Sequence, residues 1–303
     1  MAQDVPPCPV CGDARVRAMP FRYIYLGGEI RALGCRRCGI IFLHPQPTAE
    51  ELKRLYSSEY FDGGDFRCGH EGGYCEPETL ERLADPRLLM HILNIHPGRR
   101  FLEIGCAAGA FLAAARRLGF TVQGVELSEE ASRKAREQFG LPVFTGQLAD
   151  AGFAAGSFDV VFMGDVLEHL PDPVGALGEI HRVLAPGGLL VIGVPSQTNT
   201  LFSRLGFTVY GMLGKHTTVS LPPYHLFEYR PGSLRRLLAQ CGFAVTEIRQ
   251  GIIPPGAVHL RGPALERIGK KAFQYPNWLL TRLLGACGDR IEAYALKGPG
   301  RAL

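Results

Sequence analysis

Hydrophobic and polar residues alternate in blocks through the central part of the chain. A largely apolar run at residues 101–104 breaks into a turn with two glycines, Gly105 and Gly109, and a helical pattern follows at 110–118. A second apolar run at 120–125 ends in an acid. Short apolar runs on either side of a helix predict a strand–loop–helix–strand unit.

The polar positions of this unit indicate a nucleoside site. Gly105 and Gly109 let the backbone pass close to a ligand, and the first turn of the following helix offers N–H groups to an anion. Glu126 stands at the carboxyl end of the second strand, where its carboxylate can accept hydrogen bonds from both ribose hydroxyls. We therefore expect a cofactor that contains a nucleoside.

Two cofactor classes compete for this loop. A dinucleotide fold needs Gly-x-Gly-x-x-Gly, in which the second glycine lets the backbone approach a pyrophosphate. Ala107 occupies that middle position here, and Glu103 places an acid at the strand end, where it would stand beside the pyrophosphate. Both residues count against a dinucleotide.

The alternation of strands and helices continues toward the C-terminus, which predicts a parallel sheet. In order, the pattern predicts a buried strand at 157–165, a helix end and tight turn at 181–188, a strand at 189–194, a helix at 233–240, a strand at 243–248 and a last strand at 290–296. These motifs, with Val166-Leu-Glu-His169 after the fourth strand, resemble the small-molecule branch of the class I S-adenosylmethionine-dependent methyltransferases over residues 85–250. The resemblance implies an α/β fold, a Rossmann-like seven-stranded methyltransferase sheet with helices on both faces.

The same resemblance implies where the cofactor lies. The loop at 103–109 holds the methionine end of S-adenosylmethionine, Glu126 holds the ribose, and the residues after the third strand lie along the adenine. The residues assigned to the cofactor are Glu103, Gly105, Cys106, Ala107, Gly109, Glu126, Leu127, Gln147, Leu148 and Asp165.

A second group of polar residues follows the fourth strand. Asp165, Glu168 and His169 are spaced i, i+3 and i+4, which would place them on one face of a helical turn. They resemble the Glu-x-x-Glu-His of ubiquinone-pathway O-methyltransferases and small-RNA 2′-O-methyltransferases, which hold a divalent cation with a downstream histidine. His225 has a suitable position for that histidine. Glu168, His169 and His225 are the candidate catalytic residues.

Three roles stay open for this group. His169 or His225 can serve as a general base or bind the substrate without a metal. With Asp165, they can instead hold a divalent cation that brings substrate hydroxyls to the methyl group and lowers a hydroxyl pKa. The group can also be purely structural. Asp in place of the first Glu shortens the reach and counts against the metal.

The cysteines predict a separate metal site. Cys8 and Cys11 form one Cys-x-x-Cys pair, and Cys35 and Cys38 form another 23 residues later. Two such pairs can close a tetrahedral thiolate cage around a structural Zn²⁺, with no open position for water. The alternative is two redox-active pairs or a chance spacing. The segment between them, 15–33, has the aromatic and β-branched character of a hairpin.

Composition and length fit an ordinary soluble enzyme. At 303 residues and 46% hydrophobic content, the chain has room for one large α/β domain and a small appendage. The longest uncharged stretch, 183–203, is broken by prolines, so we expect no membrane-spanning helix. The N-terminus lacks the basic start and apolar core of a signal peptide, which favours the cytoplasm.

We expect three parts in the chain. A zinc ribbon at 1–45 is followed by a linker with N-terminal helices at 46–98 and by a methyltransferase domain at 99–303. Two stretches exceed the minimal fold, at 196–223 and 251–288; they can cover a substrate pocket or form a membrane-surface or dimer contact. The linker is expected to hold helices at 48–56 and 79–95, with a loop rich in glycine and aromatic residues at 57–76.

The acceptor is the least determined feature. Residues 8–40 hold six arginines against two acids, a local charge of +4 that can meet RNA or a nucleotide-linked substrate, or can simply be solvated. A zinc module ahead of this fold resembles the nucleotide-sugar C-methyltransferases and a bacterial ribosomal-RNA guanine methyltransferase. The Asn-Pro-Pro-Tyr motif of amino-methylating nucleic-acid enzymes is absent.

We therefore favour methyl transfer to an oxygen or carbon of a small-molecule acceptor, such as a sugar nucleotide or another biosynthetic intermediate. The alternatives are an RNA methyltransferase that docks through its zinc ribbon and a non-catalytic zinc-ribbon binding protein. The oligomeric state is left open.

Overall fold

The computed structural model describes residues 5–25, 27–48, 50–51, 86–219, 225–252, 254 and 264–299, with only the backbone at 264–273. Its larger sheet has seven strands. They are β4 (Arg100–Ile104), β5 (Thr121–Glu126), β6 (Val143–Thr145), β7 (Phe158–Gly164), β8 (Leu184–Pro195), β11 (Phe243–Gly251) and β12 (Arg290–Lys297). Their order in the sheet is β11-β12-β8-β7-β4-β5-β6.

Six of these strands run in one direction, all but β12, and their carboxyl ends share one edge of the sheet. β4 pairs in parallel with β5 and β7, β5 with β6, and β7 with β8, whereas β12 is antiparallel to both β8 and β11. In such sheets, ligands bind outside the carboxyl ends of the strands. The predicted seven-stranded α/β sheet is confirmed, and its strand order brings the ends of β4, β5 and β7 side by side.

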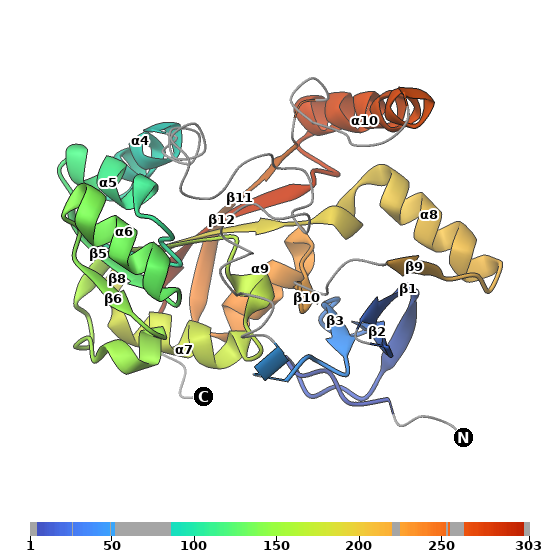
Figure 1. Cartoon of the computed structure of the whole chain (residues 1–303), viewed down its shortest axis with the longest axis horizontal. Helices are drawn as coiled ribbons and strands as arrows, with labels where there is room; N and C mark the ends of the chain where they lie inside the picture. Colours follow the sequence, from blue (N-terminus) through green and yellow to red (C-terminus); the bar gives the residue numbers. More distant parts are fainter. Residues whose placement is uncertain are drawn as a thin grey trace.

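Helices cover both faces of this sheet (Figure 1). The described helices are α4 (Pro86–Ile95), α5 (Ala110–Arg117), α6 (Glu129–Phe139), α7 (Pro173–Val183), α8 (Leu201–Met212), α9 (Pro231–Gln240) and α10 (Ala264–Leu284). One core cluster joins α4, α5 and α6 to the sheet, and another joins α7 and α9 to it. Burial of these apolar stripes against the strands is the main stabilising contribution to the domain.

A second sheet contains the predicted N-terminal hairpin. β1 (Val16–Tyr25) and β2 (Gly28–Cys35) are antiparallel, and β2 also pairs with β3 (Ile41–His44). Two short strands from later in the chain complete this sheet: β9 (Thr217–Val219) lies beside β1, and β10 (Phe227–Glu228) lies beside β3. The N-terminal module is therefore joined to the methyltransferase region by backbone pairing.

The N-terminal module also shares a hydrophobic core with α9. Cys8, Val10 and Cys38 belong to the same buried cluster as Leu234 and Leu237 of that helix. The Gln240 side chain donates a hydrogen bond to the Val10 carbonyl at 2.9 Å. This packing joins residues on both sides of position 45, where the sequence predicts a domain boundary. That boundary stays a prediction.

Each of the two stretches beyond the minimal fold forms a helix. In Figure 1, α8 lies above the small sheet, where Phe207 stacks on Phe21 with ring centroids 5.3 Å apart. α10 occupies much of the second stretch. Several apolar side chains are exposed on both helices, including Met212 at 82% and Leu283 at 71%.

The predicted helices of the linker are described only in part. Thr48 and Glu51 form a reciprocal cap at the start of the helix expected at 48–56: Glu51 N–H donates to Thr48 Oγ1 at 3.3 Å, and Thr48 N–H donates to the Glu51 carboxylate at 2.7 Å. Residues 86–95 are helical, as expected. The predicted loop at 57–76 lies outside the described residues. Among the helices that the structure describes, none is long and apolar enough to cross a membrane.

Candidate functional site

The loop after β4 has an unusual backbone that explains its glycines. Gly105 and Gly109 have φ values of 73° and 83°, and Ala107 between them has a φ of 46°. Such values favour glycine. A Cβ atom on Gly105 would lie 2.4 Å from Cγ2 of Val166, and one on Gly109 would lie 2.6 Å from Cδ1 of Leu141. The loop therefore packs directly against the segment that follows β7.

Glu126 holds this loop in place. The carboxylate at the end of β5 accepts hydrogen bonds from the N–H of Ala107 at 2.9 Å and the N–H of Ser128 at 2.8 Å. Each carboxylate oxygen has a further lone pair, so Glu126 can still accept from a ribose hydroxyl. Burial raises the pKa of Glu126, although its backbone hydrogen bonds act in the opposite direction.

Glu103 is a buried acid beneath the same loop. The residue is 5% exposed, and its Oε2 has no hydrogen-bond partner among the described residues. Burial, together with repulsion from Glu126, raises the pKa of Glu103 to about 8. A buried carboxyl oxygen without a donor is costly. The amino group and ribose hydroxyls of S-adenosylmethionine are donors of the kind that this loop lacks, so the residues present fit that cofactor.

The other predicted cofactor residues lie around this loop and the strand ends. Cys106 is buried, and Leu127, directly after Glu126, is 64% exposed. An exposed leucine beside a nucleoside loop offers an apolar surface to a base. Gln147 is exposed, and Leu148 begins the short 3-10 turn η1 (Leu148–Ala151) after β6. These positions leave Leu127 and Leu148 available to an adenine.

The structure brings together the three predicted catalytic side chains. Ligand atoms of Glu168, His169 and His225 all lie within 4.8 Å of one another. His169 Nε2 lies 3.5 Å from a Glu168 carboxylate oxygen, and the two imidazole rings are 5.0 Å apart, edge to face. Glu168 and His169 belong to the 3-10 turn η2 (Leu167–His169). The Leu226 N–H donates a hydrogen bond to the Glu168 carbonyl at 2.8 Å.

Glu168 is the most constrained member of this cluster. Its side chain is 1% exposed, and neither carboxylate oxygen has a hydrogen-bond partner in the described ranges. Burial, followed by repulsion from Asp165, raises its pKa well above the ordinary value. A buried carboxyl in this state favours a proton, a cation or a substrate hydroxyl at its oxygens.

Asp165 is not part of this cluster, so the prediction that it shares a helical face with Glu168 and His169 is wrong. Its φ is 53°, which ends the strand before the turn at 167–169 begins. Arg290 Nη2 lies 2.6 Å and 2.7 Å from the two oxygens of its carboxylate. The ion pair links the end of β7 to the start of β12.

Two charged residues of this region had no role in the sequence-based reading. Arg290 is the partner of Asp165, and no local pattern connects residues so far apart. Glu228 is buried, and one of its oxygens lies 3.9 Å from His225 Nδ1. In the sequence, the i, i+3 spacing of His225 and Glu228 was the signal that could have revealed this contact.

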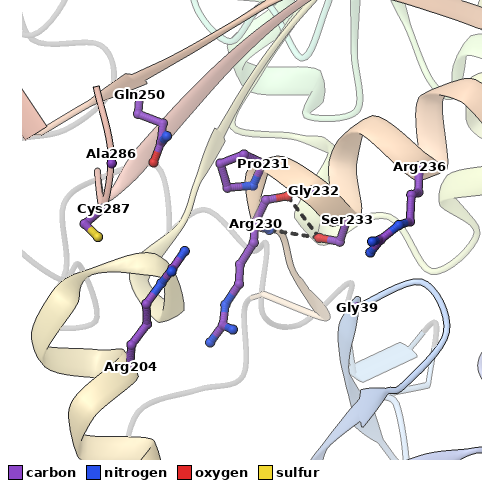
Figure 2. Close-up of a pocket in the computed structure, with 10 residues that line it drawn as sticks. All are labelled: Gly39, Arg204, Arg230, Pro231, Gly232, Ser233, Arg236, Gln250, Ala286 and Cys287. Atoms are coloured by element: carbon purple, nitrogen blue, oxygen red, sulfur yellow. Dashed lines mark hydrogen bonds between the residues drawn. The ribbon is translucent and has the colours of Figure 1, made fainter. Parts of the chain in front are cut away.

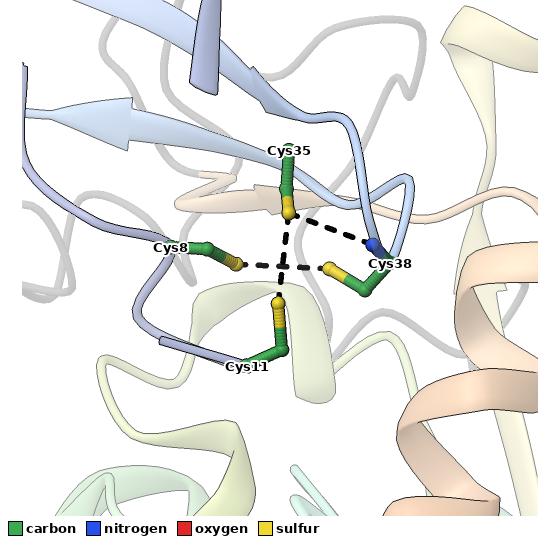
Figure 3. Close-up of side chains that lie close together, drawn as sticks. All are labelled: Cys8, Cys11, Cys35 and Cys38. Atoms are coloured by element: carbon green, nitrogen blue, oxygen red, sulfur yellow. Dashed lines mark hydrogen bonds between the residues drawn. The ribbon is translucent and has the colours of Figure 1, made fainter. Parts of the chain in front are cut away.

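The four predicted zinc ligands converge at the edge of the N-terminal module (Figure 3). Cys8 and Cys38 have sulfur atoms 3.6 Å apart, as do Cys11 and Cys35, and all four sulfurs lie within 4.8 Å of one another. In a tetrahedral site with Zn–S bonds of about 2.3 Å, neighbouring sulfurs are about 3.8 Å apart. The donor set and its spacing fit a structural zinc.

Comparisons with known proteins agree with this geometry. Residues 77–248, more than half of the chain, match the family described as "Methyltransferase domain". The chain is 29% identical over 161 residues to a ubiquinone biosynthesis O-methyltransferase of Thiobacillus denitrificans, covering 50% of this chain and 67% of that protein. It is 41% identical over 110 residues to one of a Caulobacter species, covering 33% of this chain and 42% of that protein.

Solved structures show the same fold. A SAM-dependent methyltransferase of Archaeoglobus fulgidus superposes with a TM-score of 0.50 at 21% identity, over 72% of this chain and 94% of that one. The [4+2]-cyclase SpnF superposes with a TM-score of 0.53 at 18% identity, over 84% and 99%. At these identities, structural likeness shows the fold alone, so the family match and the curated relatives carry the assignment. The chain belongs to the methyltransferase domain family and is an S-adenosylmethionine-dependent methyltransferase.

Proposed function

We propose that the protein transfers the methyl group of S-adenosylmethionine to an oxygen or carbon of a small-molecule acceptor. The observation that supports this most strongly is the contact between the two parts of the site. Val166 packs against Gly105 of the cofactor loop and directly precedes the turn that holds Glu168 and His169. A cofactor on that loop and an acceptor at the cluster would therefore be neighbours, as a single displacement requires.

The cofactor would be held at the carboxyl ends of β4 and β5. Glu103 and the loop through Gly109 would bind the amino acid end, Glu126 the ribose, and Leu127 and Leu148 the base. When bound, S-adenosylmethionine supplies an electrophilic methyl group on a sulfonium that is already a good leaving group. The protein then has two tasks, alignment of the acceptor and removal of its proton.

His225 is the general base that the site supports best, with Glu228 as its positioning residue. A carboxylate near Nδ1 favours the tautomer with a free Nε2 and stabilises the imidazolium that forms when the ring takes a proton. The separation of 3.9 Å is longer than a hydrogen bond, and such contacts often tighten in the substrate complex. His169 lies against the same ring and can bind the acceptor hydroxyl.

A divalent cation is a second candidate for this cluster. Glu168 offers two buried oxygens without hydrogen-bond partners in the described ranges, and His169 and His225 add two nitrogens nearby. One carboxylate and two imidazoles are a common donor set for a catalytic metal that keeps open positions for substrate oxygens. Chelation with EDTA followed by readdition of Mg²⁺, Mn²⁺ or Zn²⁺ separates this role from metal-free catalysis.

Curated relatives favour a small molecule as the acceptor. Several are named for ubiquinone biosynthesis, and one, a protein of Staphylococcus saprophyticus 26% identical over 190 residues, is named a demethylmenaquinone methyltransferase. None of these names includes a nucleic acid. RNA remains the alternative acceptor because the N-terminal module carries an excess of arginine.

The four cysteines are proposed to bind one structural zinc. Four thiolates leave no coordination position for water, so the zinc would stabilise the fold and would take no part in catalysis. It would fix the module against α9, since Cys8 and Cys38 share a core with Leu234 and Leu237. A cytoplasmic location, expected from the sequence, would keep the thiols reduced.

Transfer of labelled methyl from S-adenosylmethionine into a fractionated cell extract tests the acceptor class. We expect label in a low-mass fraction whose amount does not change when the extract is first treated with ribonuclease. Label that disappears with ribonuclease treatment would make RNA the acceptor. A protein that binds S-adenosylmethionine but labels no fraction would favour a binding role.

A further inference from the structure

A pocket of about 430 Å³ lies between the methyltransferase region and the cysteine module, and neither the cofactor loop nor the catalytic cluster lines it. Figure 2 shows that it is bounded by α8, by the start of α9, by the Gly39 turn of the cysteine module and by the loop before β12. Its lining residues are Gly39, Arg204, Arg230, Pro231, Gly232, Ser233, Arg236, Gln250, Ala286 and Cys287. Among the residues that the structure describes, this lining includes three arginines and no acid.

These arginines are bonded to neutral oxygens. Arg204 donates to the Asn199 amide oxygen at 2.6 Å, Arg230 to the Thr198 carbonyl at 2.8 Å, and Arg236 to the Cys38 carbonyl at 3.1 Å. Within the part of the chain that the structure describes, none of the three forms an ion pair. Three positive charges thus meet at one pocket without an ion-pair partner among the described residues.

The charge at Arg230 is the least compensated. Its Nε atom is buried and has no hydrogen-bond partner in the described ranges. Burial and the positive fields of Arg204 and Arg17 lower the pKa of Arg230, and Glu228 offsets this in part. A buried N–H without an acceptor is costly, so a ligand with acceptor oxygens would stabilise this arrangement.

Arg204 is held in place by a buried amide network. Asn199 is fully buried, and its Nδ2 donates to Gln250 Oε1 at 2.8 Å and to the Gly288 carbonyl at 2.9 Å. These two bonds use both amide protons, which leaves Oδ1 to orient the Arg204 guanidinium. Preorganised charges of this kind bind a ligand with a smaller entropic cost than free surface side chains.

We propose that this pocket binds a phosphate or diphosphate group of the small-molecule acceptor, an inference that rests on the proposed function. Arginine forks match the tetrahedral oxygens of phosphate. Gly232 and Ser233, in the first turn of α9, also line the pocket, and a helix N-terminus favours an anion. Arg230 follows Glu228 by two residues, so the pocket adjoins the His225 segment. A bound diphosphate would thereby anchor the acceptor beside the catalytic cluster.

The lining disfavours single-stranded nucleic acid as the ligand. Proteins that bind such strands combine a basic track with aromatic side chains on which bases stack. None of the described residues that line this pocket is aromatic, and its arginines converge on one small space. RNA binding is therefore an outcome that the test must separate from binding of a compact phosphate.

Calorimetric titration of the full-length protein with inorganic diphosphate at low ionic strength tests the proposal. We expect Arg204→Gln and Arg230→Gln each to raise the dissociation constant about tenfold or more, because each removes a charged donor. Arg235→Gln is the matched control: it removes the same charge from α9, and Arg235 does not line the pocket. We expect its dissociation constant to stay within about twofold of wild type.

Alkylation of Cys287 gives an independent readout. This thiol lines the pocket, so saturating diphosphate should slow its modification, which peptide mass mapping measures residue by residue. Melting curves show whether the variants fold; Arg204→Gln changes an exposed residue on α8 and keeps the test usable if Arg230→Gln unfolds.

Titration with S-adenosylhomocysteine separates the two proposals. Binding of that nucleoside together with an absence of diphosphate binding would overturn the pocket alone, whereas loss of nucleoside binding would overturn the proposed function. Equal weakening in all three arginine variants would show nonspecific attraction and also overturn the pocket. If an RNA oligonucleotide binds in a manner that depends on Arg204 and diphosphate does not bind, the pocket is a nucleic-acid site and the phosphate proposal is overturned.

Discussion

Gly105→Ala tests whether the cofactor loop is held by the packing that the structure shows. An alanine at a φ of 73° costs about 1–2 kcal/mol in backbone strain. Its Cβ would lie 2.4 Å from Cγ2 of Val166, about 1 Å closer than the shortest ordinary contact of 3.4 Å. Overpacking of this kind adds about 1–3 kcal/mol. The summed loss of unfolding free energy is therefore about 2–5 kcal/mol.

The two contributions can be separated experimentally. Gly119→Ala places alanine at a φ of 89°, where nothing lies within 4 Å of the new Cβ, so only the backbone strain applies. Val166→Ala removes the methyl group that the Gly105→Ala side chain would strike. We expect urea unfolding to give a coupling free energy of about 1 kcal/mol or more between Gly105→Ala and Val166→Ala.

Cofactor binding should follow the same pattern. Calorimetry with S-adenosylhomocysteine should show a dissociation constant raised about tenfold or more in Gly105→Ala and partly restored in the double variant. Gly119→Ala should bind as wild type does. A Gly105→Ala variant no less stable than Gly119→Ala, with no rescue by Val166→Ala, would refute the packing argument.

Three further predictions concern the metal, the buried acid and the base. Metal analysis should find about one zinc per chain in the wild type and in Cys287→Ser but little in Cys38→Ser, which should also be less stable; equal zinc in both variants would contradict the thiolate site. Because the pKa of Glu103 is raised from 4.5 to about 8, the unliganded native state holds a proton that the unfolded chain loses in this window, and stability falls as pH rises through it. The difference in unfolding free energy between Glu103→Gln and wild type, measured by urea unfolding, should therefore shift in favour of the variant by up to about 4 kcal/mol between pH 5 and pH 9. A difference that does not change with pH would contradict the raised pKa. His225→Ala should lower kcat about 10²–10⁴-fold with little change in S-adenosylhomocysteine affinity, and turnover equal to wild type would rule it out as the base.

Local sequence patterns were sufficient for the central unit. The apolar runs that became β4 and β5 are short, flank one helix and end at glycines or acids, so each element is determined by its own residues. Gly105 and Gly109 were recognisable because only a few loop types need glycine at that spacing. The two Cys-x-x-Cys pairs could equally be recognised as a predicted metal site, because thiolate ligands occur in tight local turns.

Long-range pairing was beyond the reach of these patterns. β9 and β10 have three and two residues, too few for a periodic signal, and they form only because β1 and β3 offer free edges. The position of Asp165 was misjudged because i, i+3, i+4 spacing assumes continuous helix, whereas the chain turns through a positive φ there.

The arginine pocket shows the same limitation at the level of a site. Arg204, Arg230 and Arg236 come from α8, the segment after β10, and α9. Each looks like an ordinary surface arginine in the sequence. Only the docking of the cysteine module against α9 encloses the space that they line.

The structure of the protein in complex with S-adenosylhomocysteine tests the central claim most directly. We expect the nucleoside beside the loop from Gly105 to Gly109, with the ribose hydroxyls donating to Glu126 and the sulfur facing the cluster of His169 and His225. A nucleoside bound elsewhere, or one whose sulfur is remote from that cluster, would contradict the proposed site.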